Sequence, residues 1–446
     1  MRRAEGSPSL LDDAHRGVHL SEACPYGESV TTAGLGEDDL PLTDWERAVD
    51  ALLQASHVVA PHQLPGLIAE HAEAFGARDA IVYLADLQQV SLVPFVGSSL
   101  PQLGAVETRP VDSTIAGRCF QRVEVLSQPE ATGTRLWLPL LNGTERLGVL
   151  AVTWAGGAPE RGSTAHVRLT RFVSLVAELV VTKTAYGDTI VTTRRTAPMG
   201  LASEIQWGLL PPLTFACDQL VLAGALEPAY EVAGDSLDYA VDEGVARFAM
   251  FDGMGHGLRS AQLAVLAVSA YRHARRSHRS LRDTADLVDT AMVEGFGGET
   301  FATAVLAELD TGTGLLSWIS AGHPEPLLLR DGQLVKTLHV EPGLPFGMDL
   351  GEDIGYRVGT EQLQPGDRVL VYTDGVTEAP SPDGHRFGED RLADLLCRNL
   401  AAGLPAPETM RRVIRALLDH QQGHLDDDAT LLLLEWETDG NLRLLP

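Results

Sequence analysis

The pattern of apolar and polar residues between positions 44 and 186 predicts one α/β unit. Two stretches with helical spacing come first, strand-like runs follow, and another helical stretch ends the unit (45–56 and 64–76; 79–86, 90–96, 135–141 and 147–155; 163–186). Gly76 is placed to end the second helix, and Asn142-Gly143 is typical of a two-residue hairpin turn. This order of helix, sheet and helix has the size of a sensor domain.

The second half of the chain has a different pattern, with helices grouped between runs of antiparallel strands. We expect helices at 257–276, 280–296, 388–400 and 406–422, and strands within 301–338, 368–373 and 429–436. Asp331-Gly332 is a type I′ turn signal inside this set. Such grouping favours an α+β layered domain over a doubly wound one.

These patterns divide the chain into four segments. Residues 1–43 are rich in Gly, Ser, Asp and Glu without periodicity, and are predicted to be a disordered leader. The sensor-sized domain then covers 44–186, a linker with a short connecting helix covers 187–212, and the second domain covers 213–440.

The charge balance limits the classes of partner. The chain of 446 residues has 34 Lys and Arg against 61 Asp and Glu, a net charge of −27. This excess of acid argues against binding to nucleic acid or to an anionic membrane. The four cysteines are far apart, and neither a signal peptide nor an apolar run of membrane-spanning length is present. A cytoplasmic protein is expected.

One acidic hairpin points to a metal site. The midpoint between Asp235 and Asp252 falls within the turn Asp242-Glu243-Gly244, so a regular ladder would place the two aspartates directly opposite, about 5 Å apart. Like charges in such positions repel each other. A bound Mg²⁺ or Mn²⁺, which prefers oxygen ligands, would explain the pairing.

Further aspartates stand at the ends of apolar strands. Asp374 follows one strand, and Asp426, Asp427 and Asp428 precede another. Each alone is an ordinary turn former. Together with the hairpin pair, however, they predict a site for two metal ions that would clamp a phosphoryl group and activate a water.

Two histidines lie in glycine-rich segments, His256 in GMGHG and His323 in AGHP. Each is a candidate proton donor or ligand-orienting group, or else a histidine that merely bonds to loop backbone. His256 is the better catalytic candidate. It follows Asp252 by four residues and precedes a helix whose N-terminus favours an anion.

Seven motifs, in order, make the second half resemble the RsbU/SpoIIE-type phosphatases, a branch of the PPM family of metal-dependent Ser/Thr protein phosphatases. They are EVAGDSLDYA (231–240), FDGMGHG (251–257), FATAVLAELD (301–310), SAGHPEPLLL (320–329), GLPFG (343–347), VYTDGVTEA (371–379) and DDATLLLL (427–434). The resemblance implies an antiparallel β-sandwich flanked by helices, with two Mn²⁺ or Mg²⁺ ions in an acidic cleft.

Matched motif by motif, the resemblance also implies the ligands. Asp235 resembles the bridging ligand, and the Asp252 carboxylate, the Gly253 carbonyl, Asp374 and Asp427 complete the metal site. The family pattern Asp-Asp-x-Thr favours Asp427, with Asp428 as the alternative. Catalytic roles fall to Asp235, Asp252 and His256. The chain departs from the family pattern after Asp235, where Ser236 and Leu237 replace the usual aromatic residues.

The first domain resembles a GAF sensor through DSTIAGRCFQ (112–121) and LPLLNGTERLGVLAVTW (138–154). Its ligand is not indicated by these segments. Cys119, within the first of them, is a candidate chromophore or redox position, although a small buried side chain is the more ordinary interpretation.

The resemblances imply a protein-serine/threonine phosphatase that acts on a phosphorylated partner of the anti-sigma-factor-antagonist class. A signal at the GAF-like domain would modulate it through 163–210, in a homodimer. Two alternatives stay open: a non-catalytic module that docks a partner, and a metal-dependent phosphoesterase for small molecules.

Overall fold

The computed structural model describes residues 43–97, 106–227, 230, 234–348, 355–423 and 425–446. From Asp44 onward the chain forms one compact unit. Apart from Thr43, the predicted disordered leader lies outside the described residues, and the other predicted domain boundaries stay predictions. Within the described ranges, every helix is too short or too polar to cross a membrane.

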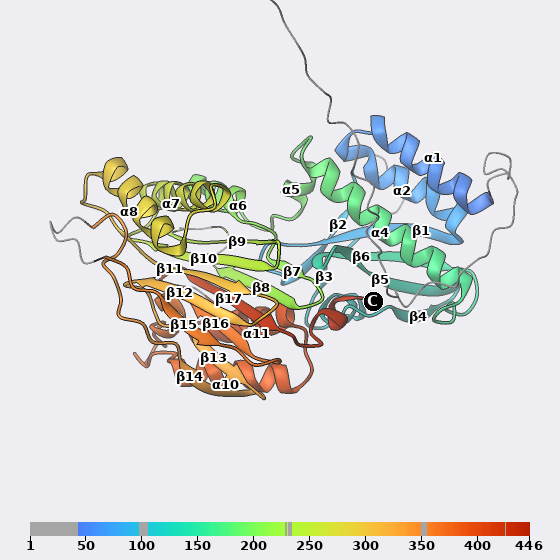
Figure 1. Cartoon of the computed structure of the whole chain (residues 1–446). Coiled ribbons are helices and arrows are strands. Elements are labelled where there is room, and N and C mark those ends of the chain that lie inside the picture. The colour runs from blue at the N-terminus through green and yellow to red at the C-terminus, as the bar shows by residue number, and fades with distance from the viewer. Residues whose placement is uncertain (1–42, 98–105, 228–229, 231–233, 349–354, 424) are drawn as a thin grey trace, which may run out of the picture. The chain divides into compact units, whose positions relative to one another are not determined.

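The N-terminal part is built on a six-stranded antiparallel sheet with helices on both faces (Figure 1). The strand order is β3-β2-β1-β6-β5-β4. The strands are β1 (Ala77–Ala85), β2 (Ser91–Phe95), β3 (Arg109–Pro110), β4 (Leu126–Glu130), β5 (Gly133–Asn142) and β6 (Glu145–Trp154). One face packs on α1 (Asp44–Val58), α2 (Leu64–Ala72) and α4 (Thr164–Thr184), and the other packs on α3 (Ile115–Arg122).

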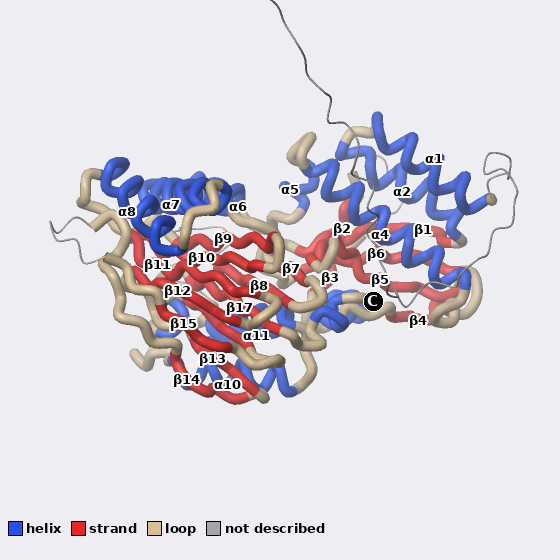
Figure 2. The backbone as a smooth tube through the Cα atoms, viewed as in Figure 1, coloured by secondary structure: helices blue, strands red, loops and turns tan. Residues whose placement is uncertain are grey.

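The C-terminal part is a sandwich of two antiparallel sheets between two helical layers (Figure 2). One sheet has the order β15-β12-β11-β10-β9 and the other β14-β13-β16-β17-β8-β7. The first consists of β9 (Asp235–Asp242), β10 (Val245–Gly253), β11 (Ala302–Asp310), β12 (Leu315–Ala321) and β15 (Gly359–Gln362). The second consists of β7 (Thr214–Ala216), β8 (Leu220–Glu227), β13 (Leu327–Arg330), β14 (Gln333–Thr337), β16 (Arg368–Tyr372) and β17 (Ala429–Trp436).

Three apolar layers hold the sandwich together. Residues such as Phe248, Trp318 and Leu432 fill the space between the two sheets. The outer face of the β9–β12 sheet packs on α7 (Leu258–Arg276) and α8 (Leu281–Phe296), and the outer face of the other sheet packs on α10 (Glu389–Ala401) and α11 (Ala406–His420). The predicted α+β class is therefore confirmed.

The hairpin turns lie where the sequence predicts them, except that one loop is shifted by one residue. Asp331 and Gly332 form the β13–β14 loop with φ of 51° and 71°, as a type I′ turn requires. In the β5–β6 hairpin, Asn142 still pairs with Glu145, so the loop residues are Gly143 and Thr144, not the predicted Asn142-Gly143. The shift arises because Gly143, with φ of 57°, takes the first left-handed position of the loop.

The predicted linker contains more structure than expected. It forms α5 (Thr189–Thr193) and α6 (Leu201–Leu209), and only α6 corresponds to the predicted connecting helix. Arg194, just after α5, donates from Nε to the carbonyl of Ala85 at 2.9 Å. The linker therefore packs on the N-terminal sheet before it reaches the sandwich.

A buried charged network joins the N-terminal sheet to α11. Glu408, in the first turn of α11, accepts from Arg146 of β6 at 3.3 Å and from Arg411 at 2.9 Å. Arg411 also bonds to Asp112, which precedes α3. The side chains of Arg146, Glu408 and Arg411 are 3%, 0% and 4% exposed. Because a buried charge without a partner costs free energy, this network favours keeping the N-terminal sheet against α11.

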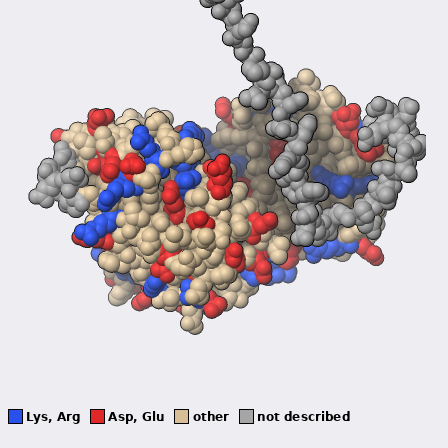
Figure 3. All heavy atoms as spheres, in the orientation of Figure 1, with Lys and Arg blue, Asp and Glu red and all other residues tan. Residues whose placement is uncertain are grey.

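Charged side chains outside such networks are distributed over the surface. On the face seen in Figure 3, acidic and basic side chains are interspersed and do not gather by sign. Most of the negative charge of the chain is therefore consistent with a solvated surface.

Candidate functional site

The central feature of the site is a pair of aspartates on neighbouring strands. Asp235 begins β9, Asp252 lies one residue before the end of β10, and the two are directly paired in the antiparallel register. The register follows from the loop Glu243-Gly244, where both residues have positive φ. The predicted pairing is therefore confirmed.

Close backbone packing at the end of the hairpin explains the glycine before Asp235. A Cβ on Gly234 would lie 2.6 Å from the Gly253 carbonyl oxygen and 2.5 Å from Ser260 Oγ. The Gly253 amide donates to the Gly234 carbonyl at 3.1 Å. Ser260 of α7 donates to the Gly253 carbonyl at 3.1 Å, and so fixes the oxygen that the resemblance assigns to a metal.

Asp374 and Asp427 stand at the same end of the sandwich. Asp374 begins the short helix α9 (Asp374–Thr377) after β16, and Asp427 lies just before β17. A Cβ on Gly375 would lie 1.9 Å from the Asp428 carbonyl, so only glycine lets these two segments touch. Both aspartates are exposed, and the Asp374 carboxyl already lies within hydrogen-bonding reach of Asp252.

The electrostatics of this cluster reflect burial and mutual repulsion. Burial, followed by the neighbouring Asp374 and Asp427 carboxylates, raises the pKa of Asp252 to about 7. Burial, and then the nearby Asp252, raises the pKa of Asp235 well above its usual range. Burial and Asp427 also raise the pKa of Asp374. The carboxylates are thus close enough to resist simultaneous ionisation without a cation.

Asp428 has a different role from its neighbour. It is buried, and its carboxylate accepts the amide of Gly234 and, at 3.4 Å, the amide of Asp235. Asp427 is exposed and accepts only the Asp428 amide, at 2.9 Å, within the described part of the chain. This geometry favours Asp427 as the ligand and Asp428 as the group that holds the start of β9.

Two residues that hold Asp235 were not predicted from the sequence. Thr373 Oγ1 donates to Asp235 Oδ2 at 2.8 Å and accepts the Thr430 amide at 2.9 Å. Gln206 of α6 donates to the Asp235 carbonyl at 2.6 Å. Thr373 directly precedes Asp374, and Gln206 lies in the connecting helix α6, but the bonding partner of neither residue can be predicted from its position in the sequence.

The two histidines occupy different environments. His256 is exposed in the bend between β10 and α7. His323 is buried, its Nδ1 lies 2.8 Å from Thr303 Oγ1, and burial lowers its pKa to about 3, so it is neutral. Thr303 is paired with Asp252 across β10 and β11. His323 therefore supports the strand beside the cluster and does not supply a proton.

The donor set fits hard divalent cations by its chemistry. It offers carboxylates that repel one another, from Asp235, Asp252, Asp374 and Asp427, and the carbonyl of Gly253, all of which are oxygen donors. Among the described side chains, no three acids, histidines or cysteines already converge on one point that could hold an ion.

Comparisons with known proteins show what the C-terminal part is similar to. Residues 242–437 match the model of stage II sporulation protein E (SpoIIE). Protein IcfG of Synechocystis sp. is 32% identical over 133 residues, which are 30% of this chain and 20% of IcfG. The phosphoserine phosphatase RsbU of Bacillus subtilis is 24% identical over 234 residues, 52% of this chain and 68% of RsbU.

Among solved structures, the chain is similar to the SiaA-PP2C domain of Pseudomonas aeruginosa, with 25% identity and a TM-score of 0.44 over 53% of this chain and 94% of that one. The chain spans only a fifth of the length of IcfG. The family model and the RsbU match both show that the C-terminal part of this chain is similar to the SpoIIE/RsbU-type PPM phosphatases.

Proposed function

We propose that the protein is a metal-dependent phosphatase that hydrolyses phosphoserine or phosphothreonine on a regulatory partner protein. The observation that carries this proposal is the direct pairing of Asp235 and Asp252, with Asp374 and Asp427 at the same end of the sandwich. Clustered carboxylates that raise each other's pKa are typical of functional sites.

The proposed roles of the residues follow from their positions. Asp235, Asp252, the Gly253 carbonyl, Asp374 and Asp427 would hold the two ions. Bound Mn²⁺ or Mg²⁺ supplies Lewis-acid activation of a water and neutralises charge on the phosphoryl group. Thr373 and Gln206 keep Asp235 in place through its side chain and its carbonyl. As the water oxygen bonds to phosphorus and the bond to the serine or threonine oxygen breaks, His256 would protonate the leaving oxygen.

We further infer that the N-terminal part is a GAF-like sensor that biases the site through the linker. Two kinds of contact support this inference. The network of Arg146, Glu408 and Arg411 ties the N-terminal sheet to α11. Gln206 of α6 ties the connecting segment to the backbone of Asp235. A shift of the sensor would therefore act on residues that hold the site.

The biological setting is proposed on the same basis. The match to the phosphoserine phosphatase RsbU supports a phosphoserine substrate, and the motif resemblance is our ground for proposing a partner of the anti-sigma-factor-antagonist class. We also propose that the protein acts in the cytoplasm, as a homodimer, and with a small ligand or other signal at the sensor. The excess of acidic residues disfavours nucleic acid as a partner.

The test is hydrolysis by the full chain of a phosphoserine peptide, with and without Mn²⁺, beside the Asp374→Asn variant. We expect Mn²⁺-dependent phosphate release that falls at least about a hundredfold in the variant. A nucleotide assayed in parallel separates a protein phosphatase from a small-molecule phosphoesterase. No release from the wild-type chain with Mn²⁺, or equal release from Asp374→Asn, would contradict the proposal.

A further inference from the structure

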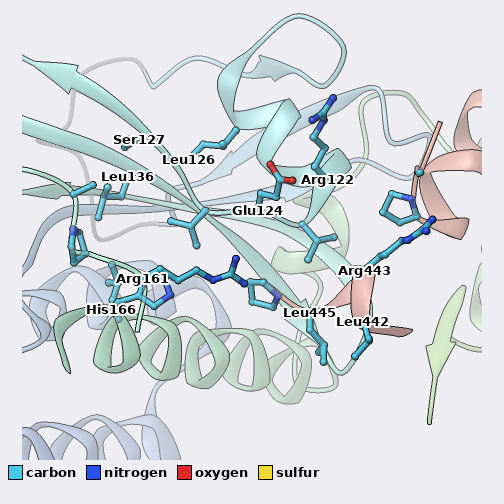
Figure 4. A pocket seen from close by; sticks show the side chains of 18 of the residues that line it. Arg122, Glu124, Leu126, Ser127, Leu136, Arg161, His166, Leu442, Arg443 and Leu445 are labelled. Carbon is cyan, nitrogen blue, oxygen red and sulfur yellow. The ribbon is translucent and has the colours of Figure 1, made fainter. Parts of the chain in front are cut away.

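A cavity of about 620 Å³ lies away from the aspartate cluster, between the N-terminal sheet and the C-terminal end of the described chain (Figure 4). It is lined by the segment after α3, by the start of α4, by residues 402–405 before α11, and by residues 442, 443, 445 and 446. Cavities of this size between parts of a protein are common places for small ligands.

The lining is unusually basic for so acidic a chain. Arg122, Arg161 and Arg443 line the cavity together with His166, against one acidic side chain, Glu124. In Figure 4 the Arg161 side chain extends from the left toward the middle of the view, Arg122 lies toward the top and Arg443 lies at the right. Three guanidinium groups against one carboxylate leave an excess of positive charge at this place, although the whole chain has a net charge of −27.

These arginines differ from those that form ion pairs elsewhere in the described residues. Arg146, Arg272, Arg330 and Arg411 each form an ion pair with a carboxylate. For Arg122, Arg161 and Arg443, the part of the chain that the structure describes provides no ion pair. Their guanidinium donors are therefore available to a ligand.

The wall behind the arginines is apolar. Leu442 and Leu445 are 64% and 57% exposed and line the same cavity, so their side chains are accessible to a ligand. A ligand that fits this lining combines a negatively charged head for the guanidinium groups with an apolar body for the wall. An inorganic anion would leave the wall uncovered, and a neutral lipid would leave the arginines without a partner.

We propose that this cavity binds a small amphipathic organic anion, whose carboxylate or phosphate group is held by Arg161 and Arg443 and whose apolar body covers Leu442 and Leu445. The site is separate from the aspartate cluster, so the inference does not depend on the proposed phosphatase activity. Because residues of the N-terminal sheet and residues near the end of the chain both line it, the ligand would contact both parts.

The experiment is isothermal titration calorimetry on the full chain with octanoate and octyl phosphate as probes, and with octanol and inorganic phosphate as controls. We expect one molecule of at least one amphipathic anion to bind per chain, with at least about tenfold weaker binding of both controls. Tighter binding of octyl phosphate would identify a phosphate ester as the head group, and tighter binding of octanoate would identify a carboxylate.

Variants assign the binding to the cavity. Arg161→Gln with Arg443→Gln should weaken binding by about tenfold or more, whereas Arg161→Lys, which keeps the charge, should retain most of it. Arg276→Gln, at an exposed arginine at the end of α7 and outside the cavity lining, is the matched control. Circular dichroism verifies that each variant is folded. The proposal fails if neither amphipathic anion binds at millimolar concentration, if octanol or inorganic phosphate binds equally well, or if the Arg161/Arg443 variant binds like wild type.

Discussion

Asp235 and Asp252 lie directly opposite each other on β9 and β10. Burial, together with the charges of nearby carboxylates, raises the pKa of each. Such a pair destabilises the fold when both groups are ionised, because opposed like charges repel. The fold tolerates this at the edge where Asp374 and Asp427 also stand. Its stability and its metal affinity should therefore depend on the same carboxylates.

Asp252→Asn should raise the stability of the metal-free protein while it removes metal-dependent activity. The raised pKa means that wild-type stability falls as pH rises from about 4 toward 7 and then levels off, since the unfolded carboxyl ionises first. Asparagine does not ionise, so the variant avoids this loss of stability. We expect its free energy of unfolding to be higher than that of wild type by roughly 1–3 kcal/mol at pH 7.5. Thermal melting with EDTA and with Mn²⁺ measures both effects. A metal-free variant less stable than wild type would show that repulsion at Asp252 is unimportant.

Metal binding should release protons and weaken as pH falls. With a pKa of about 7, Asp252 holds a proton in much of the metal-free protein at pH 6, and an entering cation must displace it. The apparent Kd for Mn²⁺ should rise by up to about tenfold per pH unit between pH 7 and pH 6 for each proton displaced. Calorimetry in two buffers of different ionisation enthalpy counts these protons. A Kd that does not vary between pH 6 and pH 8 would contradict the expectation.

Thr373→Val should weaken metal binding with little loss of packing. The valine fills the same volume but cannot donate to Asp235 or accept the Thr430 amide. Groups that orient a metal ligand in this way typically contribute about 10- to 100-fold to affinity. Mn²⁺ titration measures the loss, and Thr373→Ser, which keeps the hydroxyl, should restore most of the affinity. Equal binding by the valine and serine variants would assign Thr373 to packing alone.

Glu408→Gln should destabilise the protein strongly, because Arg146 and Arg411 would remain buried without a carboxylate. Losing one member of such a network costs about 3–5 kcal/mol. Although burial opposes it, the surrounding arginines lower the pKa of Glu408, so its contribution is present above pH 4.5 and is lost as pH falls through its folded value. Urea unfolding at pH 7 measures the effect, with Glu294→Gln at an exposed position as control. A loss no larger than that of the control would mean that the network adds no stability.

Local signals allowed the hairpins and the acidic pair to be predicted from the sequence. Glu243-Gly244 and Asp331-Gly332 fix their registers through positive φ, which is a property of the residues themselves. Gly76 likewise takes the left-handed conformation that ends its helical segment. Once the register was known, the pairing of Asp235 with Asp252 followed.

Features that depend on distant contacts could not be predicted in the same way. Strand β8 is buried on almost every residue, between α11 and the other sheet, so its sequence lacks the alternation that marks a strand. Thr373 contacts Asp235 across 138 positions, and Arg146 contacts Glu408 across 262. Such partners are defined only by the folded sandwich.

The tip of the β5–β6 hairpin has a consequence for exchanging domains between related proteins. Its neighbours Glu145 and Arg146 have opposite charges and separate anchors, since Glu145 accepts the Thr214 amide at 2.6 Å while Arg146 binds Glu408. A chimaera with another N-terminal domain would carry different residues at the tip of this hairpin. Glu408 would then lose its contact with Arg146, and the start of β7 would lose its contact with Glu145. A functional graft would have to keep this dipeptide with the C-terminal domain, so the modular boundary lies within the hairpin and not only in the linker.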